Sequence, residues 1–159
     1  MNDYNLKSKW VLWYHSLKNK SWDNKSYVKV IEIKSLLDYK LLEDIIRINH
    51  LQNGMFFLMK NDIFPTWEDP KNRMGGCLSF KYDNNILNEW LKILLLCITE
   101  ELSDYNKEIN GLSISPKKEF NICKLWLREH DENYTDYIKE YEPFFTKEKS
   151  LIKKHELSD

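Results

Sequence analysis

The sequence predicts an α+β fold in which helices pack on one face of a curved antiparallel sheet. Short segments rich in aromatic and β-branched residues recur along the chain, with polar or glycine-containing turns between them. Other segments carry apolar residues at helical spacing. Because three helices would cover the convex face of the sheet, its concave face would remain open as a ligand slot.

Seven segments are predicted to be strands. The first is an aromatic and branched run at residues 9–15, and the second alternates between apolar and polar residues at 26–33. The other five are residues 55–59, 76–82, 109–115, 120–127 and 150–155, the last of them a short edge strand.

Three helices complete the predicted elements. The first is capped by Ser35 and runs to about residue 51. Its apolar stripe consists of Leu37, Leu41, Ile45 and Ile48. The second runs from residue 86 to about 102, with Trp90, Leu94, Cys97 and Ile98 facing inward. The third is expected over residues 133–141, where Pro143 stops it.

The composition limits the class of protein. With 159 residues, 42% apolar and 31% charged, the chain fits one globular domain, expected over residues 9–159 after a flexible segment at 1–8. The net charge of −1 argues against binding a long nucleic acid through its backbone, so a nucleic-acid ligand should be short or read locally. No apolar run is long enough to cross a membrane, and no secretion signal opens the chain.

The side chains that carry most chemistry do not form a catalytic set. Three cysteines, Cys77, Cys97 and Cys123, lie far apart in apolar segments, which favours buried, reduced thiols and a cytoplasmic location. The four histidines are scattered, and the sequence contains neither a glycine-rich phosphate loop nor a metal-ligand cluster. We therefore expect a binding protein without cofactor or metal, rather than an enzyme.

Two tryptophans in polar loops suggest a binding site. Trp67 follows Pro65 in a loop stiffened by prolines, and the glycine pair at 75–76 is expected to let the chain turn into the next strand. Trp22 is the only apolar residue of the loop at 18–24. For Trp22 alone, a ring folded onto the surface is an equally good interpretation, but as a pair the two rings are suited to sandwich a flat heterocycle.

Glu68, next to Trp67, suggests which heterocycle would fit. An ionised carboxylate only accepts hydrogen bonds. Guanine presents two neighbouring N–H donors, whereas adenine would face one carboxylate oxygen with a lone pair, so this pairing favours guanine. The competing interpretation is an ordinary solvated loop acid.

The last two long strands add candidate cations. Period-2 alternation turns Leu112 and Ile114 toward the helices, and it turns Ile122, Lys124 and Trp126 toward the open face. The intervening turn carries Lys117 and Lys118, which with Lys124 are suited to hold phosphates as point charges. The alternative for the turn pair is simple solvation.

These residues together resemble the eukaryotic translation initiation factor 4E family of mRNA cap-binding proteins. The resemblance spans about residues 6–142 and rests on these motifs: the run at 9–14, Trp22, the stretch at 63–69 with Lys71, Asn72 and the glycine pair, Trp90 through Glu100, Gly111 and Trp126. It implies a cupped sheet in which Trp22 and Trp67 sandwich 7-methylguanine and Glu68 accepts its N–H groups. Trp126 would contact the methyl group, and Lys117 would contact phosphate.

The chain also departs from the family pattern. Cys77 replaces a phosphate-binding Arg and Ile122 replaces a phosphate-binding Lys, so Lys124 is the expected substitute. The family binds a scaffold protein's helix on its convex back, and the matching positions here are Leu6, Ile45 or Ile46, Leu91, Lys92 and Leu95. Lys92 reverses the family's acidic charge, and an Ile replaces its first-helix Trp.

We therefore expect a monomeric protein that captures capped mRNA and recruits a scaffold for translation initiation. One alternative is a cap-binding repressor that does not engage the standard scaffold. Another is an interaction protein that has lost cap binding, as Cys77 and Ile122 suggest. An enzyme acting on caps ranks last, because no nucleophile or metal set is visible.

Overall fold

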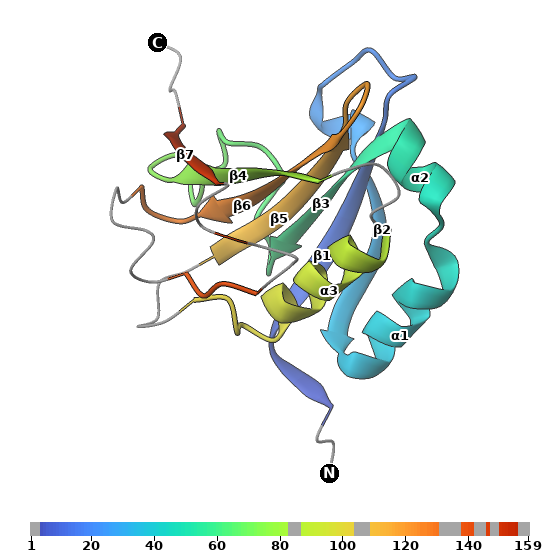
Figure 1. Ribbon diagram of the computed structural model, residues 1–159, viewed down its shortest axis with the longest axis vertical. Coiled ribbons are helices and arrows are strands. Elements are labelled where there is room, and N and C mark those ends of the chain that lie inside the picture. The colour runs from blue at the N-terminus through green and yellow to red at the C-terminus, as the bar shows by residue number, and fades with distance from the viewer. Residues whose placement is uncertain are drawn as a thin grey trace.

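A computed structural model of the chain describes residues 4–82, 87–103, 109–130, 138–141, 146 and 150–155. Its strands are β1 (Asn5–Ser16), β2 (Val28–Ser35), β3 (Gly54–Lys60), β4 (Gly76–Tyr82), β5 (Ile109–Pro116), β6 (Asn121–Leu127) and β7 (Leu151–Lys154). Its helices are α1 (Leu36–Ile45), α2 (Ile48–Asn53) and α3 (Leu87–Ile98), with a 3-10 turn, η1, at Asn24–Ser26. All seven predicted strands are present (Figure 1).

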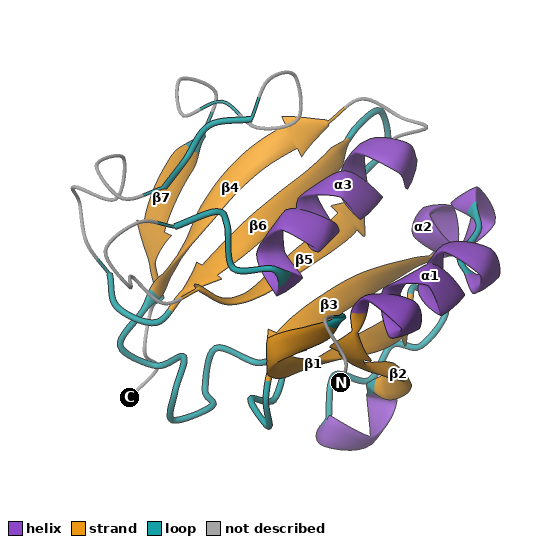
Figure 2. Cartoon of the chain, turned by 90° about the horizontal axis from the view of Figure 1, so that it is seen from below, coloured by secondary structure: helices purple, strands orange, loops and turns teal. Residues whose placement is uncertain are grey.

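The strands form a single sheet in the order β2-β1-β3-β5-β6-β4-β7. Each neighbouring pair is antiparallel. Strand β7 lies at one edge, as predicted, and pairs with β4. The sheet curves, and α1, α2 and α3 lie on the same side of it (Figure 2). The predicted α+β fold with helices on one face is confirmed.

Strand β1 begins earlier than the sequence pattern indicated. Asn5 pairs with Ser35 of β2, and the Leu36 N–H donates to the Tyr4 carbonyl at 2.8 Å. Residues 5–8, expected to be flexible, therefore lie in the sheet. Their backbone pairing is a long-range contact that the polar local sequence does not signal.

The first predicted helix is two helices. Ser35 caps α1 as expected, because its hydroxyl accepts from the Asp38 N–H at 3.3 Å. Ile46 then adopts an extended conformation, and α2 starts at Ile48. The break falls in a run of three isoleucines around Arg47, and β-branched residues have lower helix propensity because their χ1 freedom is restricted in a helix.

The part of the predicted apolar stripe that lies on α1 faces solvent. Leu37, Leu41 and Ile45 are 59%, 56% and 50% exposed. The buried residues of this helix are instead Tyr39 and Leu42. Tyr39 fixes α1 beside α3, because its hydroxyl donates to the Leu91 carbonyl at 3.0 Å.

The third predicted helix, at 133–141, lies largely outside the described residues. Its described part, residues 138–141, is not helical. Ile138 instead forms an isolated antiparallel bridge with Ser103, and its side chain is buried in the main core.

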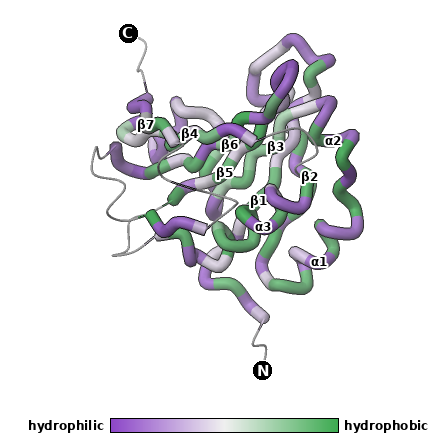
Figure 3. The backbone as a smooth tube through the Cα atoms, viewed as in Figure 1, coloured by the Kyte–Doolittle hydropathy of each residue, from purple (hydrophilic) through white to green (hydrophobic). Residues whose placement is uncertain are grey.

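The main core lies between the sheet and the helices. All four residues predicted to face inward on α3, namely Trp90, Leu94, Cys97 and Ile98, are buried in it. The alternation predicted for β5 and β6 is also correct, because Leu112, Ile114, Cys123 and Leu125 belong to this core. Hydrophobic residues concentrate on the central strands and α3, while the β1–β2 loop is hydrophilic (Figure 3).

Candidate functional site

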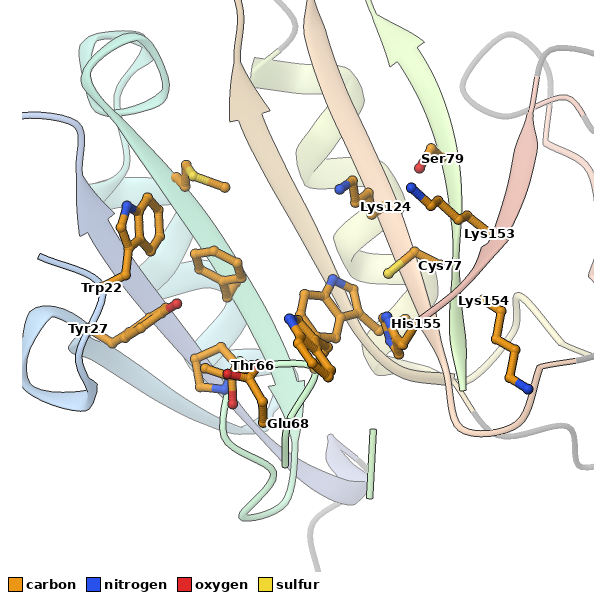
Figure 4. Close-up of a pocket in the computed structure, with 15 residues that line it drawn as sticks. Trp22, Tyr27, Thr66, Glu68, Cys77, Ser79, Lys124, Lys153, Lys154 and His155 are labelled. Carbon is orange, nitrogen blue, oxygen red and sulfur yellow. The ribbon is translucent and has the colours of Figure 1, made fainter. Parts of the chain in front are cut away.

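The concave face of the sheet contains a pocket of about 740 Å³, within the size range of small-ligand sites. Its lining comes from the β1–β2 loop, the β3–β4 loop, and strands β3, β4, β6 and β7 (Figure 4). The lining residues are Trp22, Tyr27, Met55, Phe57, Pro65, Thr66, Trp67, Glu68, Cys77, Ser79, Lys124, Trp126, Lys153, Lys154 and His155. The pocket thus brings together five predicted site residues from separate segments: Trp22, Trp67, Glu68, Lys124 and Trp126.

The Trp67 loop is held by a carboxylate and two buried amides. Asp69 accepts from the Phe64 N–H and the Lys71 N–H, both at 2.9 Å. The Asn72 side-chain amide donates to the Thr66 carbonyl at 2.8 Å. Asn110, from β5, donates both to the Asn72 side-chain oxygen at 2.9 Å and to the Lys71 carbonyl at 2.8 Å.

These asparagines are structural supports that the sequence analysis did not single out as such. Asn72 and Asn110 are both completely buried. Both donations from the Asn110 amide reach the Trp67 loop, so this network ties the loop to the sheet, although the Asn110 side-chain oxygen has no partner among the described residues. The sequence contains only part of the information needed to find them. Asn72 belongs to the motif at 71–76, whereas Asn110 looks like an ordinary polar residue near the start of a strand.

The glycine pair supports close packing rather than a turn. No described glycine has a positive φ, so the expected conformational role is not used. A Cβ on Gly75 would overlap the Leu127 carbonyl oxygen, and one on Gly76 would lie 2.5 Å from the Lys153 carbonyl oxygen. The pair is required because β6 and β7 both approach the backbone here, leaving no room for side chains.

Trp22 lies on a buried histidine. Its ring stacks on His15 with centroids 3.6 Å apart and planes within 5°. His15 is fully buried, and its Nε2 donates to the Ser21 carbonyl at 2.8 Å, which fixes the ring beneath the loop. Trp22 is nevertheless 52% exposed, because only one face of the indole is covered. The sequence pattern shows His15 only as a strand residue, because it does not indicate that the loop after β1 folds back over the ring.

Glu68 is exposed at the pocket margin, near the Tyr27 hydroxyl (Figure 4). Burial raises the pKa of Tyr27, and the Glu68 carboxylate adds to that rise. Tyr27 makes edge-on contacts with His15 and Trp22, at 5.3 and 6.0 Å between centroids. The carboxylate therefore lies on the side of the pocket formed by the β1–β2 loop aromatics.

Trp126 forms part of the pocket floor. Its indole N–H donates to the Ser113 hydroxyl at 3.0 Å, and only 7% of the residue is exposed. Trp67 packs partly buried against the small cluster to which Trp126 and Phe57 belong. Because Trp126 is hydrogen-bonded and packed, it has one orientation available to a ligand.

The predicted cations are divided between two places. Lys124 lines the pocket, whereas Lys117 and Lys118 are exposed in the β5–β6 turn and do not line it. The pocket also contains Lys153, Lys154 and His155, which sequence analysis did not nominate. Their signal was hidden because only the pairing of β7 with β4 brings the end of the chain to this site.

Among the described residues, the three cysteines are free and buried, as predicted. Burial raises the pKa of Cys77, which lines the pocket, to about 12. The described residues contain no group of three side chains suited to hold a metal ion. No helix in the described part of the chain is long and apolar enough to cross a membrane.

The residues predicted to form the partner face are differently exposed. Ile46 and Leu91 are buried, at 3% and 7% exposure, and Leu6 and Leu95 are partly buried against the core. Ile45 and Lys92 are exposed. The exposed apolar surface on the helical side includes the α1 stripe, which consists of Leu37, Leu41 and Ile45. It also includes Val28 and Val30 of β2, which line an apolar pocket together with Ile45.

The fold and pocket define a class of α+β protein with a ligand-sized pocket on the open face of a helix-backed antiparallel sheet. Solved structures share this arrangement. A Caenorhabditis elegans eIF4E-3, solved in complex with the 4E-binding protein Mextli and a cap analog, superposes with a TM-score of 0.71 and 27% identity, over 79% of this chain and 75% of that one. Ascaris suum eIF4E-3 with m7G cap gives 0.72 and 22% identity, over 86% and 79%, which supports the fold.

Sequence comparison identifies the family to which the chain belongs. The family model described as eukaryotic initiation factor 4E matches residues 5–150, so the chain belongs to that family. The eukaryotic translation initiation factor 4E of Candida albicans is 32% identical over 139 residues, covering 80% of this chain and 66% of its own length. The human factor of that name is 28% identical, with 78% and 60% covered. The relatives are thus named as initiation factors and not as enzymes, and this chain spans two-thirds of their length or less.

Proposed function

We propose that this protein binds the 7-methylguanosine 5′ cap of mRNA in the concave pocket and acts in translation initiation in the cytoplasm. Trp22 and Trp67 stack on the methylated base, Glu68 accepts its two N–H groups, and Trp126 contacts the methyl group. Lys124 holds the phosphates, whereas Lys117 and Lys118, which the sequence also suggested, lie in the β5–β6 turn outside the pocket. Residues 9–159 serve as a single cap-binding domain that is monomeric on its own.

The observation that carries this proposal is the distribution of charge in the pocket. Glu68 lies on the side of the β1–β2 loop aromatics, while Lys124 and Lys153 lie on the side of β4, β6 and β7 (Figure 4). A methylated guanine is cationic and its phosphates are anionic. A ligand with a positive base and a negative tail therefore matches the pocket in orientation as well as in sign.

The position of Trp22 is compatible with stacking. One face of its indole rests on His15, and half of the residue remains exposed. A base that stacks on the exposed face would extend the His15–Trp22 stack by one ring. Each such aromatic–base contact contributes roughly 1–3 kcal/mol. The Caenorhabditis elegans relative solved with a cap analog, at 27% identity, supports a ligand of this kind.

The test is a titration with a 7-methylguanosine triphosphate analogue, followed by tryptophan fluorescence. Stacking on two indoles is expected to quench their emission in a saturable manner. The matched ligand is unmethylated guanosine triphosphate, which has the same phosphates but a neutral base and should bind more weakly. Unchanged emission at high concentrations of the methylated ligand would remove cap binding from consideration.

Trp67→Ala should abolish measurable binding, because it removes one stacking ring and leaves the neighbouring carboxylate without a base to orient. Since Trp67 is also partly packed against Trp126 and Phe57, thermal unfolding must accompany the titration. A folded Trp67→Ala variant with wild-type affinity would contradict the sandwich.

The helical side is the proposed site for a scaffold or regulator that binds through a short helix. Its exposed apolar surface includes the α1 stripe and the neighbouring Val28 and Val30 of β2, and Lys92 of α3 is also exposed. A Schistosome relative was solved with both m7GpppG and 4E-BP. At 22% identity this supports only the shared fold, so the partner site rests on the exposed residues themselves.

A cap-binding repressor is the second candidate function. Two observations favour it: Lys92 is basic where the family resemblance expects an acid, and α1 presents aliphatic residues instead of a tryptophan. A pull-down with a scaffold-type helical peptide separates the candidates. Capture of the peptide by the cap-loaded protein supports the initiation role, and its absence supports repression.

A further inference from the structure

Few of the positions at which the sequence predicted a phosphate-binding cation place a positive charge in the pocket. Cys77 lines the pocket where the family resemblance expects an arginine, and burial keeps its thiol neutral by raising its pKa to about 12. Ile122 is likewise uncharged, and Lys117 and Lys118 do not line the pocket. Of the lysines predicted from the sequence, only Lys124 therefore remains in the pocket.

Strand pairing places a lysine directly beside Cys77. In the register of β4 with β7, Cys77 lies opposite Lys153, and on its other side it lies opposite Trp126 of β6. Directly opposed residues in an antiparallel sheet project from the same face. Trp126, Cys77 and Lys153 therefore form one row across the concave face, and Lys153 extends that row to the edge strand.

Lys124 belongs to the adjacent row. It lies opposite Ser79, two residues along β4 from Cys77 and hence on the same face. Lys153 extends from β7 back toward Ser79 and Lys124, whereas Lys154 points away from them (Figure 4). The proximity of Lys124 to this part of the pocket is also seen electrostatically, because its charge opposes the rise in the pKa of Cys77 and helps to lower the pKa of His155.

The edge strand is held close at this point. The His155 N–H donates to the Gly75 carbonyl at 3.0 Å, and the Lys153 carbonyl lies against Gly76. His155 also packs against Trp126, with ring centroids 5.5 Å apart. Lys153 therefore belongs to a strand that is held to β4 by backbone hydrogen bonds and to the pocket floor by the contact of His155 with Trp126.

We propose that Lys153, acting with Lys124, forms the anion subsite of this pocket and supplies the charge that Cys77 lacks. The subsite recognises the polyphosphate bridge of a capped nucleotide. It lies over β4 near Ser79, with Lys124 on the neighbouring strand β6 and Lys153 on the other neighbour, β7. This inference rests on the proposed cap binding. It adds that phosphate affinity depends on the end of the chain rather than on the β5–β6 turn.

The experiment compares four ligands in the fluorescence titration: 7-methylguanosine and its mono-, di- and triphosphates. Lys153→Ala should lower affinity for the triphosphate three- to tenfold while leaving the unphosphorylated nucleoside within twofold of wild type. Its salt dependence should also become shallower, because one counterion-releasing contact is lost. Lys153→Arg should retain triphosphate affinity.

Two matched controls locate the effect. Lys154→Ala removes a neighbouring charge from the same strand, and Lys117→Ala removes one from the turn; both should stay within twofold of wild type for the triphosphate. Equal triphosphate affinity in Lys153→Ala and wild type, or equal losses in Lys153→Ala and Lys154→Ala, would overturn the assignment. Failure of cap binding itself is distinguishable, because wild-type protein would then bind none of the four ligands.

Discussion

At the scale of single residues, the most informative contact is the stack of Trp22 on His15. A buried histidine anchored to the Ser21 carbonyl serves as a platform for a loop tryptophan. The platform explains how a ring in a polar loop acquires a defined plane without being buried. His15 is thus a positioning residue, because it orients the indole without lining the pocket itself.

Trp22→Ala is expected to weaken cap binding by about 1–3 kcal/mol, or roughly 5- to 150-fold, because one stacked aromatic ring is lost. Stability should change little, because half of the residue is exposed. Titration and thermal unfolding of the same samples check both parts. An unfolded variant, or one that binds normally, would show that the ring serves the loop and not the ligand.

Glu68→Gln tests base recognition separately from stacking. The amide keeps the shape of the side chain but replaces one acceptor oxygen by a donor, which would face an N–H group of guanine. Affinity for the 7-methylguanosine analogue should fall, while affinity for an adenine-containing analogue should rise or stay equal. The measured quantity is the ratio of the two dissociation constants. If the wild-type protein already binds both analogues equally, Glu68 does not read the base.

At the scale of elements, the Trp67 loop depends on a residue from another strand. Asn110 of β5 donates to Asn72 and to the Lys71 carbonyl, so removing it leaves buried polar groups without partners. Asn110→Ala should lower the free energy of unfolding by about 1–3 kcal/mol and weaken cap binding, although this side chain does not line the pocket.

Urea unfolding and the cap titration measure these two effects. Asn53→Ala is the matched control, because the side chain of this exposed residue donates to the Asn49 carbonyl within its own helix. Its effect should stay within about 0.5 kcal/mol. If Asn110→Ala loses stability but keeps its affinity for the cap analogue, the Asn110 hydrogen bonds stabilise the core and do not set the geometry of the Trp67 loop.

The elements also show what a single sequence can and cannot predict. Alternation in β5 and β6 predicted the faces of Leu112, Ile114 and Lys124 correctly, because a period of two fixes sides once one side is buried. For α1 the sequence pattern predicted less. A helical apolar stripe shows that Leu37 and Leu41 share a face, but not whether that face meets the core or a partner.

The missed residues have a common cause. His15, Asn110 and Lys153 each act through a contact that depends on how the chain folds: the return of the adjacent loop, a buried amide pair and an edge-strand register. Local patterns contain no information about such contacts. Trp67 and Glu68 were predictable because their motif is contiguous and its chemistry lies within a few residues.

At the scale of the whole molecule, the sheet separates two surfaces. The concave pocket carries aromatic rings and charges, and the helical side carries an exposed aliphatic stripe. Between them lie the main core and strands that contribute to both sides. Changes confined to exposed residues of one surface should therefore leave the other intact, because sites without shared partners usually contribute independently.

This separation predicts opposite outcomes for two variants. Leu41→Glu places a charge in the α1 stripe, where the leucine is 56% exposed, so stability should change by less than about 0.5 kcal/mol. It should abolish capture of a scaffold-type helical peptide, because burying an unpaired carboxylate in an apolar interface is unfavourable, while the cap titration stays unchanged. Trp67→Ala should abolish cap binding while leaving capture of the peptide unchanged. Lys7→Glu, an exposed change on β1, controls for added charge. If Leu41→Glu shifts cap affinity as much as peptide capture, the two surfaces are coupled through the sheet and do not act independently.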